Sequence, residues 1–194
     1  MLAFFAGSFY RSKRGSTLDA PQNALPQAGL DDRGQQPDAG AEEGAVRAPD
    51  ISQMSPEERA DRLFNKVMIL NSQGKSDSVL FFAPMALESY RLLNPMNADQ
   101  RYDMGRIAEV AGAIPLAGAQ ADTILQQNPT HLLGLILAAR VAGLEKNQAK
   151  EAGYVKRFLS ALESEKAKKL PEYDRHQDDI ANAAAEARKT TSGK

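Results

Sequence analysis

The sequence predicts an all-α protein: a short right-handed helical-repeat solenoid with about three helix–turn–helix pairs and a C-terminal capping helix, after a disordered N-terminal tether. A repeat is the first basis for this prediction. Asn94-Pro95 and Asn128-Pro129 lie 34 residues apart, and each pair follows an amphipathic helical segment. Composition is the second basis, because alanine and leucine are plentiful, tryptophan is absent and aromatic residues make up only 6%, which suits close-packed helices better than a sheet.

The bulk composition excludes several classes of function. The chain has 194 residues, enough for one ordinary domain with appendages. Its net charge of −1 gives no electrostatic preference for nucleic acid, so no nucleic-acid partner is expected. The absence of cysteine excludes disulfides, thiolate metal sites and thiol catalysis, and it leaves the redox compartment open.

Residues 1–14 combine an apolar run with a basic cluster that follows it. The run is roughly half of the about 20 apolar residues that a spanning helix needs, and a signal peptide would carry its positive charge before the run. Three interpretations stay open: the inner half of a truncated anchor that begins upstream, a segment lying in the membrane interface, or a terminus without a role. By the positive-inside rule an anchor would place the rest of the chain, otherwise expected to be soluble, in the cytoplasm. The residues expected to contact a membrane are Leu2, Phe4, Phe5, Phe9, Tyr10, Arg11, Lys13 and Arg14.

Residues 15–53 are expected to form a disordered linker. Proline and glycine alternate there with aspartate, glutamine and alanine, and β-branched and aromatic residues are almost absent. Such a segment cannot bury enough apolar surface to offset the entropy lost on ordering. The linker would therefore let the folded part move some tens of ångströms from whatever holds the N-terminus.

A helical domain is expected over residues 54–190, followed by a tail at 191–194. Ser55, Pro56 and Glu58 form a capping box with proline at the first helical position, and this signal starts the first helix. Further helix starts and stops are marked by caps, glycines and prolines along the chain. The expected helices span 56–74, 77–93, 98–111, 114–127, 131–141, 148–168 and 171–188.

Three of these helices have distinctive patterns. Pro84 lies inside the second helix and predicts a kink or a delayed start. The fifth helix, which Thr130 is expected to cap, is apolar on most faces and should lie in the middle of the stack. The last helix carries Tyr173, Ile180 and Ala184 on one side and is polar elsewhere, as a terminal cap over an otherwise exposed repeat should be.

Small residues and prolines recur at matching positions in these helix pairs. In the middle unit Gly105 lies midway along the first helix, Ala117 lies early in the second, and Pro129 closes the unit. With these residues the chain resembles the tetratricopeptide repeat (TPR) family over about residues 56–168. Small residues let two helices approach closely, and the terminal proline forces a turn into the next pair. Ala83, Pro95 and Ala139 also match in the flanking units, whereas Asn71, Glu151 and Glu163 depart from the pattern.

The resemblance implies a concave groove that binds a peptide or protein segment. Arg106 and Arg140 occupy equivalent places one repeat apart, so beside Tyr102 they could hold an acidic group or a terminal carboxylate of a partner. The alternative is that each arginine pairs with a local carboxylate such as Asp103 or Glu109, or is solvated. The positions that the resemblance assigns to the groove are Asn65, Met68, Ser72, Asp99, Tyr102, Arg106, Glu109, Leu133, Ile136 and Arg140.

No pattern in the sequence predicts catalysis, so no enzyme, no cofactor and no metal is expected. His131 and His176 lie far apart and neither has a metal-ligand spacing. His131, at a helix start, is expected to be a capping or surface residue, and Asp178-Asp179 a solvated helix face. No Ser/His/Asp elbow, phosphate-binding glycine loop or pair of catalytic carboxylates can be placed.

The expected function is therefore a non-enzymatic protein–protein interaction module, a TPR-like scaffold or adaptor that docks a protein or peptide segment reversibly. Two alternatives stay open. The first is a structural subunit of a larger membrane protein complex, with the repeats packed permanently on a neighbour. The second is a small-ligand-binding helical bundle, which a closed pocket with convergent ionisable groups would favour.

Overall fold

The computed structural model describes residues 54–192, and these residues form helices and connecting turns without a strand. This confirms the predicted all-α class. The expectations for residues 1–14 and 15–53, and for the last two residues of the tail, lie outside the described residues. The helices are α1 (Pro56–Ser72), α2 (Ser76–Arg91), α3 (Ala98–Val110), α4 (Ile114–Gln127), α5 (Leu132–Leu144), α6 (Gln148–Lys166), α7 (Pro171–Arg175) and α8 (Gln177–Ser192).

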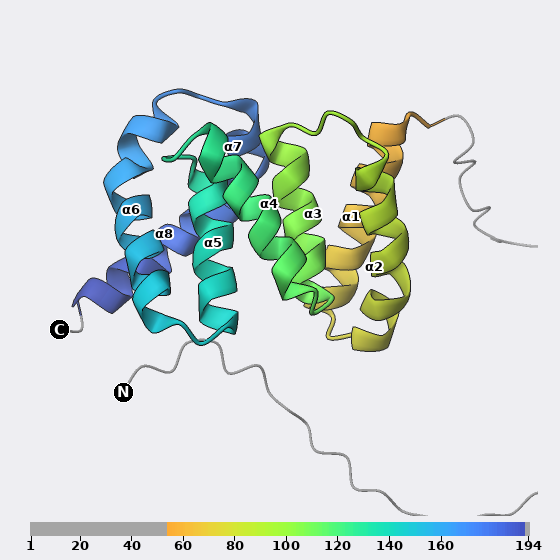
Figure 1. Cartoon of the computed structure of the whole chain (residues 1–194), viewed down its shortest axis with the longest axis horizontal. Helices are drawn as coiled ribbons and strands as arrows, with labels where there is room; N and C mark the ends of the chain where they lie inside the picture. The colour runs from red at the N-terminus through yellow and green to blue at the C-terminus, as the bar shows by residue number, and fades with distance from the viewer. Residues whose placement is uncertain (1–53, 193–194) are drawn as a thin grey trace, which may run out of the picture. The chain divides into compact units, whose positions relative to one another are not determined.

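Helices α1 to α6 pack as three successive pairs, α1 with α2, α3 with α4, and α5 with α6 (Figure 1). Neighbouring pairs also touch, because α2 packs on α3 and α4 packs on α5. In addition, the first helices of the pairs contact one another in the order α1, α3, α5. This succession of pairs is the helical-repeat arrangement that the 34-residue spacing predicts.

Local caps and turns explain where the early helices begin and end. Ser55 and Glu58 close the predicted capping box, with the Glu58 amide donating to Ser55 Oγ at 3.1 Å and the Ser55 amide donating to Glu58 Oε2 at 2.8 Å. Asn97 and Gln100 form a second capping box at the start of α3. The turn after α1 places Gly74 at φ 68°, a conformation that favours glycine.

Glycines allow neighbouring helices to approach one another closely in the core. A Cβ atom on Gly105 of α3 would lie 2.3 Å from Leu137 Cδ2 of α5, so only glycine allows this approach. Gly134 of α5 makes a similar approach, because a Cβ atom there would lie 2.8 Å from Ile124 Cγ2 of α4. Helix α5 is buried along most of its length, which agrees with its predicted place in the middle of the stack.

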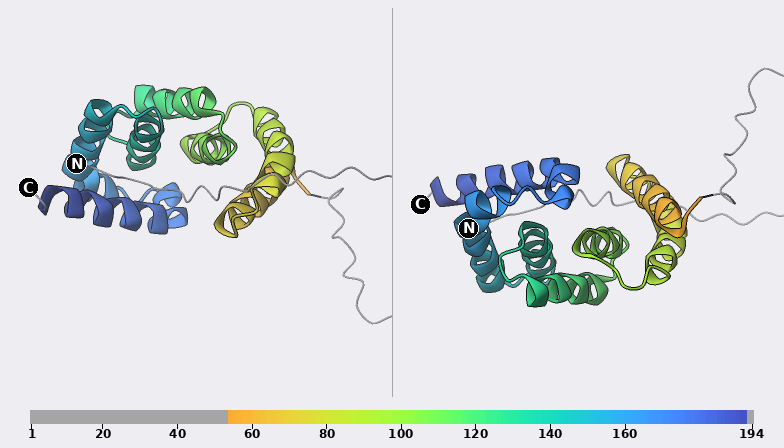
Figure 2. Two further views of the ribbon diagram at one scale, coloured as in Figure 1. Left: turned by 90° about the horizontal axis from the view of Figure 1, so that it is seen from below. Right: turned by 90° about the horizontal axis from the view of Figure 1, so that it is seen from above.

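The C-terminal segment differs from the expectation of one continuous last helix. The helix is interrupted at His176, whose φ of −108° and ψ of 29° separate the short helix α7 from α8. Helix α8 packs on α5 and α6, as a terminal cap would, and its first turn also contacts α3 through Asp179. Figure 2 shows α8 passing α5 on the side away from α4, with its first turn beside α3. Parts of α3 and α5 are therefore covered by the chain's own C-terminal segment.

None of the helices that the structure describes is long and apolar enough to cross a membrane. The residues expected to contact a membrane precede this part of the chain.

Candidate functional site

The candidate site is the inner surface, defined as the face of α1, α3 and α5 that is turned towards α7 and α8. Its polar residues are Asp61 on α1, Asp99, Tyr102, Asp103, Arg106 and Glu109 on α3, and Arg140 on α5. Of the positions that the sequence assigns to a groove, Tyr102, Arg106, Leu133 and Ile136 are buried. The first helices thus form a surface that already holds a helical segment.

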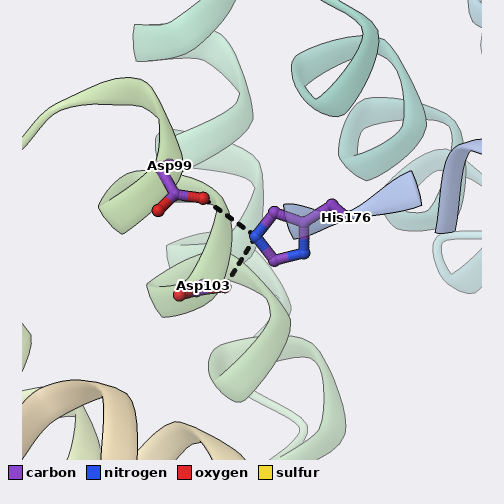
Figure 3. Close-up of side chains that lie close together, drawn as sticks. All are labelled: Asp99, Asp103 and His176. Atoms are coloured by element: carbon purple, nitrogen blue, oxygen red, sulfur yellow. Dashed lines mark hydrogen bonds and ion pairs between the residues drawn. The ribbon is translucent and has the colours of Figure 1, made fainter. Parts of the chain in front are cut away.

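Two adjacent cations at the α7–α8 break enter an acidic part of this surface. Arg175 donates from Nη1 to Asp99 Oδ2 at 2.6 Å, and from Nη2 to Asp103 Oδ2 at 2.7 Å and Asp61 Oδ1 at 3.1 Å. His176 Nε2 lies 2.9 Å from Asp99 Oδ1 and 3.3 Å from Asp103 Oδ1 (Figure 3). We call Asp61, Asp99, Asp103, Arg175 and His176 the charge cluster.

Local structure explains why these side chains converge. Asp99 and Asp103 are four residues apart on α3, so both carboxylates lie on one face of the helix. The break at His176 turns the helix axis, and Figure 3 shows the imidazole pointing between the two carboxylates. Tyr90 of α2 donates its hydroxyl to Asp103 Oδ2 at 3.0 Å, which gives that buried carboxylate a neutral donor as well.

The electrostatics of the cluster keep His176 charged. Burial by itself disfavours the imidazolium, but hydrogen bonds to Asp103, Asp179 and Asp99 outweigh it and raise the pKa of His176 to about 11. Burial also opposes ionisation of Asp99, yet His176 and Arg175 hold the pKa of Asp99 below its ordinary value. His176 and Arg175 therefore both enter the cluster as cations.

Asp99, Asp103 and His176 also offer atoms that could hold a metal ion, since one ligand atom from each lies within 4.8 Å of the others. A metal would need the Nε2 lone pair, because only neutral imidazole is a ligand. In the observed arrangement Nε2 faces the two carboxylates as a proton donor, and Arg175 occupies their second oxygens. A metal ion would have to displace the proton on Nε2 and the guanidinium of Arg175. The geometry therefore favours ion pairs within the protein over a metal site.

A second contact joins α3 to α8 beside the cluster. Tyr102 donates its hydroxyl to Asp179 Oδ2 at 2.9 Å, and the centroids of the Tyr102 and His176 rings lie 4.8 Å apart in a T-shaped arrangement. Burial disfavours ionised Asp179, but His176, Arg106 and Tyr102 outweigh it and lower the pKa of Asp179 to about 2. Asp179 was expected on a solvated face, and that expectation is wrong because α8 turns this carboxylate towards α3.

Arg106 and Arg140 meet at one carboxylate. Arg106 Nη1 donates to Glu109 Oε2 at 3.0 Å, and Arg140 donates from Nη2 to Glu109 Oε1 at 2.6 Å and from Nε to Glu109 Oε2 at 2.9 Å. The two arginines thus lie one repeat apart on the same face, and both pair with a local carboxylate. Only 8% of the Arg106 side chain is exposed, so its charge is satisfied inside the protein.

The α1 part of the predicted groove is not covered by α7 or α8. Asn65 and Ser72 are exposed and Met68 is half-buried, and Ser72 Oγ donates to Ile69 O at 2.8 Å. Asn65 lines a shallow depression of about 390 Å³ that begins beside Asp61 of the charge cluster. The other lining residues are Met54, Glu58 and Arg62. An external segment could therefore contact this end of the inner surface directly.

A further group of polar residues anchors α7 at the α5–α6 end. Tyr173 donates its hydroxyl to Glu165 Oε2 at 2.9 Å and accepts from the Leu132 amide at 3.2 Å. His131 lies at the N-cap position of α5 without making a capping bond, and it is buried with Nε2 3.3 Å from Glu172 Oε1. The expectation of a surface histidine is wrong, because α7 covers it.

Sequence reasoning missed the partners that make the site. Arg175 and His176 contact residues of α3 that lie more than seventy positions earlier in the chain. The one available signal was the four-residue spacing of Asp99 and Asp103, which predicts a shared helix face without predicting what faces it.

No family model, curated protein or solved structure matches this chain. The class of protein therefore rests on the fold and the site, which define an all-α helical-repeat protein with a self-covered inner surface.

Proposed function

We propose that this chain is a non-enzymatic protein–protein interaction module of the TPR type, which binds a helical segment of a partner protein on its inner surface. The observation that carries the proposal is the position of α7 and α8. The first helices bind this helical segment by ion pairs and hydrogen bonds. Helical repeats present extended surfaces of this kind to segments of other proteins.

Charge also supports a binding role for this surface. Asp61, Asp99 and Asp103 gather on α1 and α3, and they favour a partner segment that brings cations. The uncovered depression beside Asn65 leaves part of the same surface open to a partner. Binding would be non-covalent and reversible, with specificity set by the position of the acidic groups.

A site-specific cross-link tests the proposal. Because the chain has no cysteine, Asn65→Cys gives a single attachment point for a photo-activated cross-linker on α1. The matched control is Ala119→Cys, an exposed position on α4. In extracts of the native source, we expect the Asn65 probe to label a partner at a basic helical segment, mapped by mass spectrometry. Equal labelling from Ala119, or no labelling from Asn65, would contradict the proposal.

A second candidate is a structural subunit of a larger complex, and the exposed apolar side chains of α2 favour it. Phe81 is 68% exposed, Leu80 and Met85 are also exposed on this helix, and Leu92 at its C-cap is 72% exposed. Exposed apolar patches commonly mark sites where another protein binds. Under this candidate Phe81→Glu should release the chain from its native complex on a native gel, whereas Arg175→Glu should not. Membrane association through residues 1–14 remains a prediction that flotation of the full chain with lipid vesicles would test.

A further inference from the structure

We infer that α7–α8 is an internal ligand of the inner surface, and that the partner segment is a helix that copies its chemistry and displaces it. The inference rests on the proposed function and specifies the partner: two adjacent cations at a helix start, an acid three residues later, and small apolar residues on one face. In this chain those features are Arg175, His176, Asp179, Ala184 and Ala187.

The cationic pair contacts the acidic residues of two first helices. Arg175 contacts carboxylates from two different helices, Asp61 on α1 and Asp99 and Asp103 on α3. Planar guanidinium groups suit such multiple acceptors better than a lysine does. His176 lies between Asp99 and Asp103 and would be matched by any compact cation at this position.

The acid of the segment has its own partner. Asp179 accepts from the Tyr102 hydroxyl, and Arg106 contributes to the low pKa of that carboxylate. A segment with the cationic pair but without the acid would leave the buried Tyr102 hydroxyl without this acceptor. The spacing from Arg175 to Asp179 therefore sets the register of a competing helix.

The apolar contact of α8 is small, which favours its displacement, and the large buried side chain of the segment is Tyr173 of α7. Ile180, Ala184 and Ala187 are its buried apolar side chains, and two of the three are alanines. Since apolar stabilisation scales with the area removed from water, alanines hold a helix weakly compared with leucine or phenylalanine. A partner with larger side chains at the two alanine positions would gain area over the internal segment.

The connection between α6 and α7 allows the segment to leave while staying tethered. It consists of the four residues 167–170, which lie between the two helices. The tether gives the internal ligand an effective concentration on the order of millimolar, so an external segment competes at a disadvantage until the internal contact is weakened.

The test uses the full chain and a labelled peptide with the sequence of residues 169–192, with binding followed by fluorescence anisotropy. Arg175→Glu in the full chain weakens the internal ligand and leaves the inner surface unchanged. We expect the peptide to bind this variant at least about tenfold more tightly than the wild-type chain. A peptide that itself carries Arg175→Glu should bind neither chain.

The matched control variant is Lys189→Glu in the full chain. It makes the same change of charge on α8, but the Lys189 side chain is 70% exposed and pairs with Glu186 on its own helix, so peptide binding should equal wild type. Circular dichroism should show that Arg175→Glu stays helical. If it unfolds, Arg175→Gln replaces it, because it removes the cation without adding an acid.

The outcomes separate the inference from the proposed function. Equal peptide affinity for wild type and the Arg175 variant would overturn the inference, while the Asn65 cross-link could still support the function. Peptide binding to neither chain would also overturn the inference, and loss of the Asn65 cross-link as well would overturn both. If the chain forms a stoichiometric dimer and the peptide dissociates it, the occupant of the inner surface is the C-terminal segment of a second copy. That result would overturn the inference that the occupant is a helix of another protein.

Discussion

The hydroxyl of Tyr102 on α3 donates to Asp179 Oδ2 on α8 at 2.9 Å, across 77 residues of sequence. This bond places the C-terminal helix on the same surface that the repeat pattern assigns to a partner. Because Tyr102 is fully buried under α8, an external segment that used Tyr102 would first have to move α8. The contact therefore links the fold of the chain to the control of its binding surface.

The pKa values of the two histidines should be shifted in opposite directions from the ordinary value. The carboxylates around His176 raise its pKa to about 11, whereas burial lowers the pKa of His131 below 6.5 despite the nearby Glu172. At pH 8 we expect one imidazolium and one neutral ring, visible in the NMR chemical shifts of the ring protons. His131→Gln assigns the signals, since the chain has only two histidines. Two neutral rings at pH 8 would show that the charge cluster does not hold a proton.

Stability should fall as the pH rises above neutrality. A group whose pKa is raised from 6.5 to about 11 contributes stability fully below pH 6.5, and this contribution is lost as the pH rises towards 11. Between pH 7 and 9 the free energy of unfolding should fall by up to about 1.4 kcal/mol per pH unit. Urea denaturation measures the slope, and His176→Gln should flatten it. An unchanged slope in that variant would place its origin elsewhere.

Gly105→Ala should destabilise the core. The new methyl group would lie 2.3 Å from Leu137 Cδ2, and the fully buried Leu137 has no solvent-exposed position to move into. Overpacking of this kind costs about 1–3 kcal/mol, measured as a lower urea midpoint. Gly153→Ala on α6 is the control, because nothing lies within 4 Å of its Cβ position and a helical Gly→Ala change there should stabilise by about 0.5–1 kcal/mol. A loss of stability in the control would contradict the open surroundings of Gly153 and the packing explanation for Gly105.

Glu109→Gln should cost far more than the same change at an exposed ion pair. Glu109 pairs with both Arg106 and Arg140 and its side chain is 8% exposed, so its loss removes a buried carboxylate that two arginines share. Breaking a buried pair from one side costs about 3 kcal/mol, whereas Glu88→Gln, whose partner is the exposed Arg91, should cost under about 1 kcal/mol. Thermal denaturation of both variants at one pH compares them directly. Equal losses would show that Glu109 is not a structural bridge.

Because both arginines pair with Glu109, reversing the charges of Arg106 and Arg140 is a poor probe of partner binding. If both side chains were free on the surface of a groove, this double reversal would change partner binding with little effect on folding. In the structure it would place two new carboxylates against Glu109, so a loss of partner binding could not be separated from a loss of stability.

Much of the fold of residues 54–192 is determined by residues that lie close together in the sequence. Three features depend only on residues within about one helix length: the capping box at Ser55, the turn at Gly74 and the apolar helix α5. The positions of the helices can therefore be predicted from caps and periodicity. The pairing of neighbouring helices follows as well, because short turns leave successive helices little choice but to pack together.

The candidate site, in contrast, depends on contacts that no local pattern contains. The amino-acid sequence by itself determines an all-α repeat with small residues such as Gly105 at the close approaches. Only the tertiary structure decides that the chain breaks at His176 and that Arg175 and His176 turn into the carboxylates of Asp99 and Asp103. The physical reason is distance along the chain, since these charges attract one another only after the packed helices bring segments more than seventy residues apart to within a few ångströms.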